Sequence, residues 1–277
     1  MTHPSSTPAG AGRQARWRAR YGPWVAVTGA SDGIGREFAR LLAEAGLDLV
    51  LVARRREALD AVAADLTARH GVTTRVIAVD LGRETAVETV VAETADLDVG
   101  LLVAAAGFGS SGRLVDADLE QELAMVDVNC RAVLALSWHF GRRFASRGRG
   151  GMVLMGSVVG FQGVPNAANY AATKAYVQSL AEALHVELAP LGVDVVASAP
   201  GPVHTGFAAR AGMRYDMGLV PGDVARATLD ALGGRLTVRP GWLSKVLAGS
   251  LAPLPRPARV RVMGRIMAGM AGGGRGR

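Results

Sequence analysis

The stretch that decides the fold is WVAVTGASDGIG, which covers residues 24–35. Its first part, Trp24–Thr28, is a short apolar run that predicts a buried strand. Glycines follow at 29, 33 and 35, and residues 34–45 then carry apolar side chains at helical spacing. A strand, a glycine turn and a helix in this order are typical of a site where a helix N-terminus faces a pyrophosphate. The alternative is a turn that serves only close packing of the helix on the strand.

The same alternation continues along the chain. Further strands are predicted at 47–53, 74–79, 99–104, 152–155 and 193–197, with helices at 57–70, 84–95, 119–147 and 166–191. Strands that are apolar throughout and alternate with helices predict a parallel sheet covered on both faces. The right-handed crossover rule then predicts a single-domain, doubly wound α/β fold of the Rossmann type. The last elements expected are a helix at 222–232, a strand at 236–238 and helices at 242–250 and 257–270.

Three parts are expected along the chain. Residues 1–20 predict a flexible basic arm, 21–239 the catalytic domain, and 240–277 a basic, amphipathic extension whose residues 271–277 are disordered. The extension combines Arg with Trp, Leu, Val and Met, so a weak contact with an anionic membrane surface is one hypothesis. A subunit interface or a lid over the substrate cleft is the favoured alternative.

The positive charge lies at the two ends of the chain. The 277 residues have a net charge of +7, but residues 21–234 alone sum to −6, whereas 1–20 and 235–277 contain no acid. This distribution argues against a nucleic-acid-binding domain. The preference for Arg over Lys, of which the chain has only two, is typical of a codon bias. A single cysteine, Cys130, excludes a disulfide framework, and the five scattered histidines predict no metal site. No segment predicts a membrane span or a secretory signal, so a cytoplasmic protein is expected.

The end of the second predicted strand points to a particular cofactor. Enzymes that use NAD place a carboxylate there, against the ribose 2′-hydroxyl. Here the strand ends in Ala53 and is followed by Arg54, Arg55 and Arg56. Guanidinium groups suit a 2′-phosphate through charge-assisted bonds, so NADP(H) is predicted, with Arg54 as the first ligand and Arg55 as the second. A solvated basic start to the next helix is the alternative.

These motifs together resemble the short-chain dehydrogenase/reductase family. The resemblance rests on the TGxxxGxG pattern at 28–35, on Ser157 after the fifth strand, on Tyr170 and Lys174 in a YxxxK pattern, and on Asn129. It covers about residues 22–235 and implies hydride transfer between a nicotinamide and a carbonyl or alcohol carbon. One motif departs, because the family's NNAG is Ala104-Ala105-Ala106-Gly107 here. We expect this change to cost some rigidity but not the chemistry.

The resemblance also implies which residues hold the cofactor. Asp80 matches the residue that contacts the adenine, and the stretch from Pro200 matches the part that touches the nicotinamide side. The expected cofactor-binding set is Gly29, Ser31, Asp32, Gly33, Ile34, Gly35, Arg54, Arg55, Asp80, Leu81, Ala105, Ala106, Gly107, Asn129, Tyr170, Lys174, Pro200, Gly201, Val203 and Thr205.

Four residues form the expected catalytic set. Tyr170 and Lys174 are four apart on a predicted helix and share one face, so the ammonium group can lower the pKa of the phenol. Tyr170 then exchanges a proton with the substrate oxygen, and Ser157 stabilises the charge that develops there. By resemblance, Asn129 holds a water that links Lys174 to a proton path. Taken singly, Ser157 as a loop cap and Asn129 as a cause of helix distortion are the alternatives.

The substrate is expected to be mostly nonpolar. The predicted wall contains no Lys or Arg to hold a carboxylate or phosphate, and consists of Val158, Val159, Phe161, Gln162, Val164, Phe207 and Met213. The C-terminal stretch resembles the DltE-type and 3-oxoacyl or 17-beta-hydroxysteroid reductase branch of the family. This resemblance to a branch is weaker than the resemblance to the family as a whole. The prediction is an NADP(H)-dependent oxidoreductase that forms a homodimer or homotetramer. A non-catalytic NADP-binding regulator on the same fold is the alternative.

Overall fold

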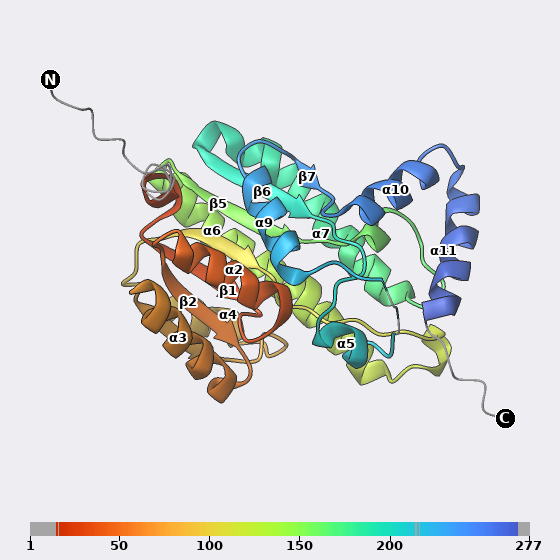
Figure 1. The fold of residues 1–277 in the computed structure, drawn as a ribbon, viewed down its shortest axis with the longest axis horizontal. Coiled ribbons are helices and arrows are strands. Elements are labelled where there is room, and N and C mark those ends of the chain that lie inside the picture. Colours follow the sequence, from red (N-terminus) through yellow and green to blue (C-terminus); the bar gives the residue numbers. More distant parts are fainter. Residues whose placement is uncertain (1–14, 16, 214, 216, 271–277) are drawn as a thin grey trace, which may run out of the picture.

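The computed structural model describes residues 15, 17–213, 215 and 217–270 (Figure 1). Its centre is a sheet of seven parallel strands in the order β3-β2-β1-β4-β5-β6-β7. The strands are β1 (Trp24–Thr28), β2 (Asp48–Ala53), β3 (Thr74–Ala78), β4 (Val99–Ala104), β5 (Gly150–Met155), β6 (Val193–Ser198) and β7 (Thr237–Val238). The predicted doubly wound parallel sheet is confirmed.

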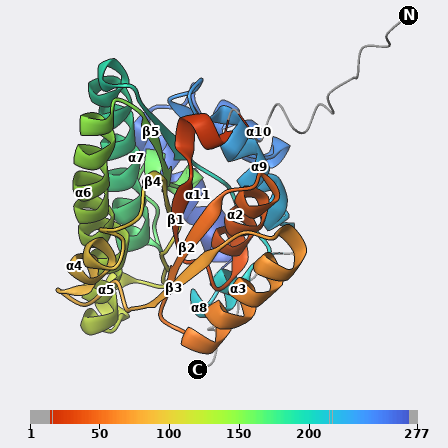
Figure 2. The same cartoon turned by 90° about the vertical axis from the view of Figure 1, so that its left-hand side faces the viewer.

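Helices cover both faces of this sheet (Figure 2). On one side lie α2 (Gly33–Glu44), α3 (Arg56–His70) and α9 (Pro221–Ala231), and on the other α4 (Ala86–Ala92), α6 (Ala132–Arg147) and α7 (Ala168–Leu188). Alternate strand residues face alternate layers: Val25 and Val27 pack in the first core, and Ala26 in the second. The chain reverses its winding between β1 and β4, so a crevice opens at the carboxyl ends of those strands.

One predicted helix, 119–147, is interrupted at Asn129, where helix distortion was the alternative interpretation of the sequence. It consists of α5 (Leu119–Val126), a π-helical turn at Asp127–Arg131, and α6. Such turns are rare and are frequent at functional sites. The turn contains Asn129, whose side chain is fully buried.

The predicted flexible arm over residues 1–20 is wrong where the structure describes it. Residues 17–21 are helical and packed on the domain. The rings of Trp17 and Tyr21 lie 4.9 Å apart, and the buried Tyr21 hydroxyl donates to Asp194 over 2.7 Å. Arg20 binds the same carboxylate through two bonds of 2.9 Å. Residues 1–14 and 271–277, for which flexibility and disorder were predicted, lie outside the described residues.

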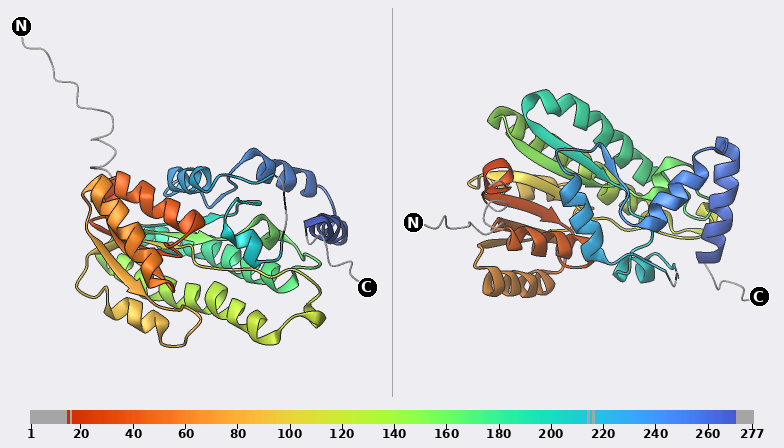
Figure 3. Two further views of the ribbon diagram at one scale, coloured as in Figure 1. Left: turned by 60° about the horizontal axis from the view of Figure 1, so that its bottom comes forward. Right: turned by 45° about the horizontal axis from the view of Figure 1, so that its top comes forward.

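The C-terminal extension forms two helices, α10 (Trp242–Leu251) and α11 (Arg256–Met270), at the end of the molecule away from the N-terminus (Figure 3). They pack over a third apolar cluster that contains Tyr170, Met213, Leu251, Met263 and Met267. The segment between β6 and α9 joins this cluster through the short helix α8 (Gly206–Arg210) and its neighbours. The helices of the described part include none long and apolar enough to cross a membrane.

Replacing Phe140 with alanine should destabilise the fold strongly. Phe140 is fully buried on α6 between that helix and the sheet, and truncation of such a ring costs about 3–5 kcal/mol. Urea unfolding measures the change. Val186→Ala on the exposed side of α7 is the control and should change the free energy of unfolding by less than about 1 kcal/mol. Equal effects of the two variants would contradict the described packing.

Candidate active site

The glycine turn after β1 is shaped by contacts that leave no room for side chains. Gly29 and Gly33 have φ angles of 68° and 54°, which favour glycine. A Cβ on Gly35 would collide with the carbonyl oxygen of Gly29, and one on Gly29 would lie 2.9 Å from the Ala106 nitrogen. Asp32 caps α2 by accepting a bond of 2.7 Å from the Gly33 N–H. Backbone therefore lines this part of the crevice, as an approaching pyrophosphate requires.

A single cavity of about 290 Å³ connects this turn to the residues after β4, β5 and β6. It brings together every predicted cofactor-binding residue except Asn129, together with Ser157. The residues present therefore fit a dinucleotide. The glycine turn and the N-terminus of α2 lie at one end of the cavity, and Tyr170 and Lys174 lie at the other end. The described residues include no group of three His, Cys, Asp or Glu side chains that could hold a metal ion.

The adenosine end of the cavity is cationic. Arg54, directly after β2, is 65% exposed and lies 3.9 Å from an oxygen of Asp80. Arg55 precedes α3 and also lines the cavity. Arg56 instead pairs with Asp60 on the outside of α3, with 3.0 Å between Nε and Oδ1. The structure thus separates two arginines that face the cavity from one that does not.

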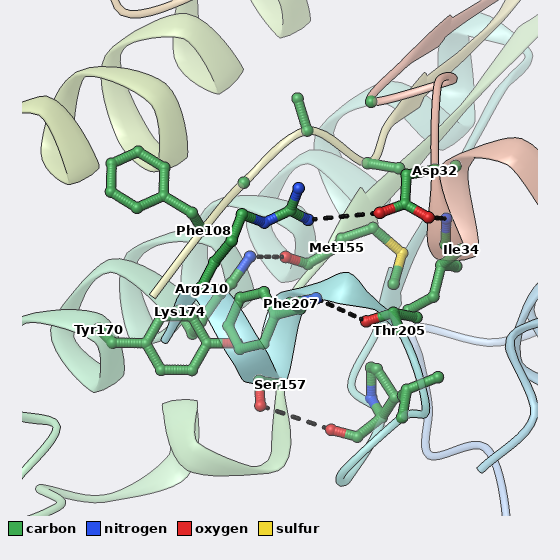
Figure 4. Close-up of a pocket in the computed structure, with 18 of the residues that line it drawn as sticks. Asp32, Ile34, Phe108, Met155, Ser157, Tyr170, Lys174, Thr205, Phe207 and Arg210 are labelled. Carbon is green, nitrogen blue, oxygen red and sulfur yellow. Dashed lines mark hydrogen bonds and ion pairs between the residues drawn. The ribbon is translucent and has the colours of Figure 1, made fainter. Parts of the chain in front are cut away.

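Tyr170, Lys174 and Ser157 converge at the other end (Figure 4). Tyr170 and Lys174 occupy successive turns of α7 and are buried. The Lys174 ammonium donates to the Met155 carbonyl over 2.8 Å and lies 5.9 Å from the centroid of the Tyr170 ring. Ser157 donates to the Pro200 carbonyl over 3.4 Å, and its oxygen also caps the short helix at Val158–Phe161. Ser157 is therefore both a loop cap and a wall of the cavity.

Burial dominates the titration of both groups on α7. It raises the pKa of Tyr170 to about 12, against the effect of a hydrogen bond with Ser157 that lowers the value. It also lowers the pKa of Lys174 to about 8. The expectation that Lys174 depresses the pKa of Tyr170 is thus wrong for this structure, because loss of solvation outweighs any attraction of the phenolate to the ammonium.

Asn129 supports the site from behind the cavity. Its amide nitrogen donates to the Phe108 carbonyl over 2.9 Å and to the Thr173 hydroxyl over 3.1 Å, and its oxygen accepts from the Phe108 N–H. A Cβ on Gly107 would lie 2.9 Å from that oxygen and 3.5 Å from the Lys174 nitrogen. The π-helical turn thus presents Asn129 to the loop after β4 and to α7 at once.

The loop with AAAG in place of NNAG is held by side chains from elsewhere. The Thr28 hydroxyl accepts from the Ala106 N–H over 3.0 Å, and Asn129 holds Phe108 as described. The hydrogen bonds from Thr28 and Asn129 thus hold the loop at Ala106 and Phe108, and no side chain of the loop takes part in them. The small Ala105 and Ala106 also fit directly against Gly29.

Several lining residues were missed in the sequence. Arg210 on α8 enters the cavity and lies 3.8 Å from Asp32 of the glycine turn (Figure 4). Tyr215 also lines the cavity and donates to the Val203 carbonyl over 2.7 Å. The largest missed group is apolar and comes from the two C-terminal helices: Leu247, Met263, Ile266, Met267 and Met270. Their spacing on α11 was a helical signal, but nothing local showed where that helix packs.

The predicted substrate wall is partly wrong. Val158, Val159, Phe207 and Met213 line the cavity as expected, whereas Phe161, Gln162 and Val164 do not. The helical turn at 158–161 directs Phe161 outward, where its ring lies 4.4 Å from the Arg239 guanidinium. Gln162 folds back to donate to the Val158 carbonyl, and Val164 packs in the cluster behind the wall.

The comparisons with known proteins agree with this geometry. The model of the family described as short chain dehydrogenase matches residues 23–215. The chain belongs to that family. A 7beta-hydroxysteroid dehydrogenase of Collinsella aerofaciens is 35% identical over 178 residues, which cover 64% of this chain and 68% of that protein. A very-long-chain 3-oxoacyl-CoA reductase of Podospora anserina is 37% identical over 179 residues. These residues cover 63% of this chain and 53% of the reductase.

Solved structures extend the likeness to most of the chain. A structure from work on 7beta-hydroxysteroid dehydrogenase stereoselectivity has a TM-score of 0.82 and 30% identity, and covers 89% of this chain and 98% of its own. A short-chain dehydrogenase of Sphingobium yanoikuyae in complex with NADPH has a TM-score of 0.75 and 32% identity, and covers 84% and 96%. This short-chain dehydrogenase is thus an oxidoreductase of CH–OH and C=O groups that uses NADP(H), as predicted.

Replacing Lys174 with methionine should stabilise the protein at about pH 7. The folded pKa of about 8 lies below the 10.5 of an unfolded lysine, so the cost of burying the charge is fully present below about pH 8 and is lost as the pH rises through 10.5. The variant also loses the hydrogen bond to the Met155 carbonyl, so the net increase in the free energy of unfolding should be about 1–3 kcal/mol. Urea unfolding at about pH 7 and about pH 10 measures it, and a gain that does not shrink at the higher pH would contradict the assignment.

Proposed function

We propose that this short-chain dehydrogenase interconverts a bulky, mostly apolar ketone and its alcohol, with Tyr170 as the group that exchanges a proton with the substrate oxygen. One observation supports this most directly. The cavity that begins at the glycine turn passes Tyr170 and ends against the methionine-rich face of α11. Cofactor and apolar substrate would therefore meet beside the phenol.

The chain's own residues divide the work along the cavity. NADP(H) supplies or accepts the hydride when bound. The glycine turn and the N-terminus of α2 would bind its diphosphate, and Arg54 with Arg55 its 2′-phosphate. Lys174 is held in place by the Met155 carbonyl, so its ammonium group would bind and orient the nicotinamide half.

The raised pKa of Tyr170 favours the direction of ketone reduction. At neutral pH a phenol with a pKa of about 12 remains protonated and can donate its proton to a carbonyl oxygen as charge develops there. The Ser157 hydroxyl would donate a second hydrogen bond to the same oxygen. Asn129 is a positioning residue in this scheme, because its amide holds Phe108 and Thr173 on the two sides of the site.

The walls indicate the class of substrate. Beyond Tyr170 the cavity is lined by Phe207, Met213, Leu247 and four residues of α11, and the one cation there, among the residues described, is Arg210, which pairs with Asp32. Methionine side chains adapt to irregular apolar shapes. This favours a large rigid or long-chain carbonyl compound, and the named hydroxysteroid and 3-oxoacyl relatives act on compounds of that kind.

Assembly is the least specified part of the proposal. Large apolar side chains on α5, α6 and α7 are exposed, namely Leu119, Leu123, Leu134, Trp138 and Tyr176. Burial of this face would support the predicted homodimer or homotetramer.

Oxidation of NADPH with a panel of ketones tests the function. We expect turnover with bulky apolar ketones and none with small sugars or keto acids, and Tyr170→Phe should lower the turnover about 10²–10⁴-fold while NADPH still binds. Tyr176→Phe, on the exposed side of the same helix, is the control. Turnover only with charged substrates would exclude the proposed substrate class. Unchanged turnover in Tyr170→Phe would exclude the proposed role of Tyr170. Binding of NADPH without turnover of any substrate would favour the non-catalytic NADP-binding regulator.

Arg54→Ala should weaken NADPH selectively. Loss of one charge-assisted contact with the 2′-phosphate should raise the KM for NADPH about 10–100-fold and leave that for NADH nearly unchanged. Arg56→Ala, which removes a guanidinium that faces Asp60 instead, should change neither constant. If both KM values rose together in Arg54→Ala, the residue would be structural.

A further inference from the structure

A second cavity lies on the outer side of α10, opposite the active site. It has a volume of about 640 Å³ and is a groove between α9 and α10 with β7 at its base. Small residues form its two walls, Ala227 and Ala231 on α9 and, on the other side, Gly249 on α10 and Ala252 just after that helix. The inner side of α10 carries Leu247 and Leu251 to the apolar cluster around the active site, so this helix separates the two cavities.

Three cations line the groove. Arg235 and Arg239 flank β7, and Lys245 projects from α10. Within the part of the chain that the structure describes, none of the three has an ion-pair partner, and the Nε of Arg239 is buried without a hydrogen bond. Asp230 in the opposite wall has a partner of its own. Among the described residues that line the groove, the three cations therefore outnumber the one carboxylate, Asp230.

An apolar rim stands beside these cations. Trp242 and Val246 share the outer face of α10 with Lys245 and are 66% and 55% exposed. Leu219, in the loop before α9, packs on Gly241 next to the start of α10, and its neighbours in that loop, Met217 and Val220, are exposed. Large exposed apolar side chains next to cations match the two layers of a membrane surface, acyl chains below phosphate headgroups.

We infer that this face, defined as the groove with Trp242, Val246, Met217 and Val220, docks on an anionic lipid bilayer. Lipid phosphates enter the groove toward Arg235, Arg239 and Lys245, and the apolar rim enters the headgroup boundary. Charge complementarity supports this occupant, because residues 235–277 contain nine Lys and Arg residues and no acid. The folded middle of the chain, with a charge of −6 over residues 21–234, would be repelled and would fix the orientation.

Co-sedimentation with vesicles tests the docking. We expect binding to phosphatidylcholine vesicles that contain phosphatidylglycerol, little to phosphatidylcholine alone, and release by salt. Lys245→Ala should lower the partition coefficient about fivefold, which corresponds to one lost charge near the surface, and Trp242→Ala should lower it by a similar factor. Val186→Ala removes another exposed apolar side chain, 68% exposed, from α7 on the other side of the sheet and should change nothing. Thermal unfolding verifies that the variants are folded.

Several results would overturn the inference. Equal binding to neutral vesicles would remove the role of the cations, and unchanged binding of Lys245→Ala and Trp242→Ala would move the contact away from α10. Saturable binding of free glycerol phosphate without binding to vesicles would make the groove a site for small anions. Self-association that is lost in Trp242→Ala, again without vesicle binding, would make the face a subunit interface.

Discussion

The burial of the Lys174 ammonium group is the constraint around which this site is built. A buried charge is costly unless it is hydrogen-bonded, and the bond to the Met155 carbonyl is the one that the structure describes. Two glycines allow the close packing around it: a Cβ on Gly160 would lie 2.8 Å from the Lys174 carbonyl, and one on Gly107 would lie 2.9 Å from the side-chain oxygen of Asn129. The protein therefore keeps a destabilising group at the point where β5, α7 and the loop after β4 meet. Such a cost is typical of functional sites.

The sequence predicted what depends on neighbouring residues. The strand, the glycine turn at 28–35 and the Arg54 that follows β2 are all local signals, and so is the four-residue spacing of Tyr170 and Lys174. These residues line one cavity as expected, because the carboxyl ends of parallel strands must meet at one edge of the sheet. Local patterns were sufficient for this half of the site.

What could not be predicted depends on residues far apart in the chain. The Thr28 hydroxyl accepts a hydrogen bond from the N–H of Ala106, 78 positions later, and no local pattern reveals that pairing. Arg210 meets Asp32 only because α8 folds back over the glycine turn. The π-helical turn around Asn129 likewise follows from its contacts with Phe108 and Thr173, since its sequence is compatible with an ordinary helix.

The C-terminal helices show how composition and packing can point in different directions. The composition of residues 240–270 is that of a basic surface segment. In the structure, however, Met263 and Met267 are among the more deeply buried side chains of the third apolar cluster. Both descriptions hold because a helix has two faces, and Arg261 and Arg265 of α11 are exposed on the face opposite Met263 and Met267. The cavity consequently changes along its length, from the guanidinium groups of Arg54 and Arg55, through the buried ammonium of Lys174, to a mostly apolar wall whose one cation among the described residues, Arg210, is paired with Asp32. A molecule with an anionic end is favoured only at the first of these positions, and an apolar one only at the last. In the proposed function, this change along the cavity would place the cofactor's phosphates at the first position and an apolar substrate at the last, with Tyr170 between them.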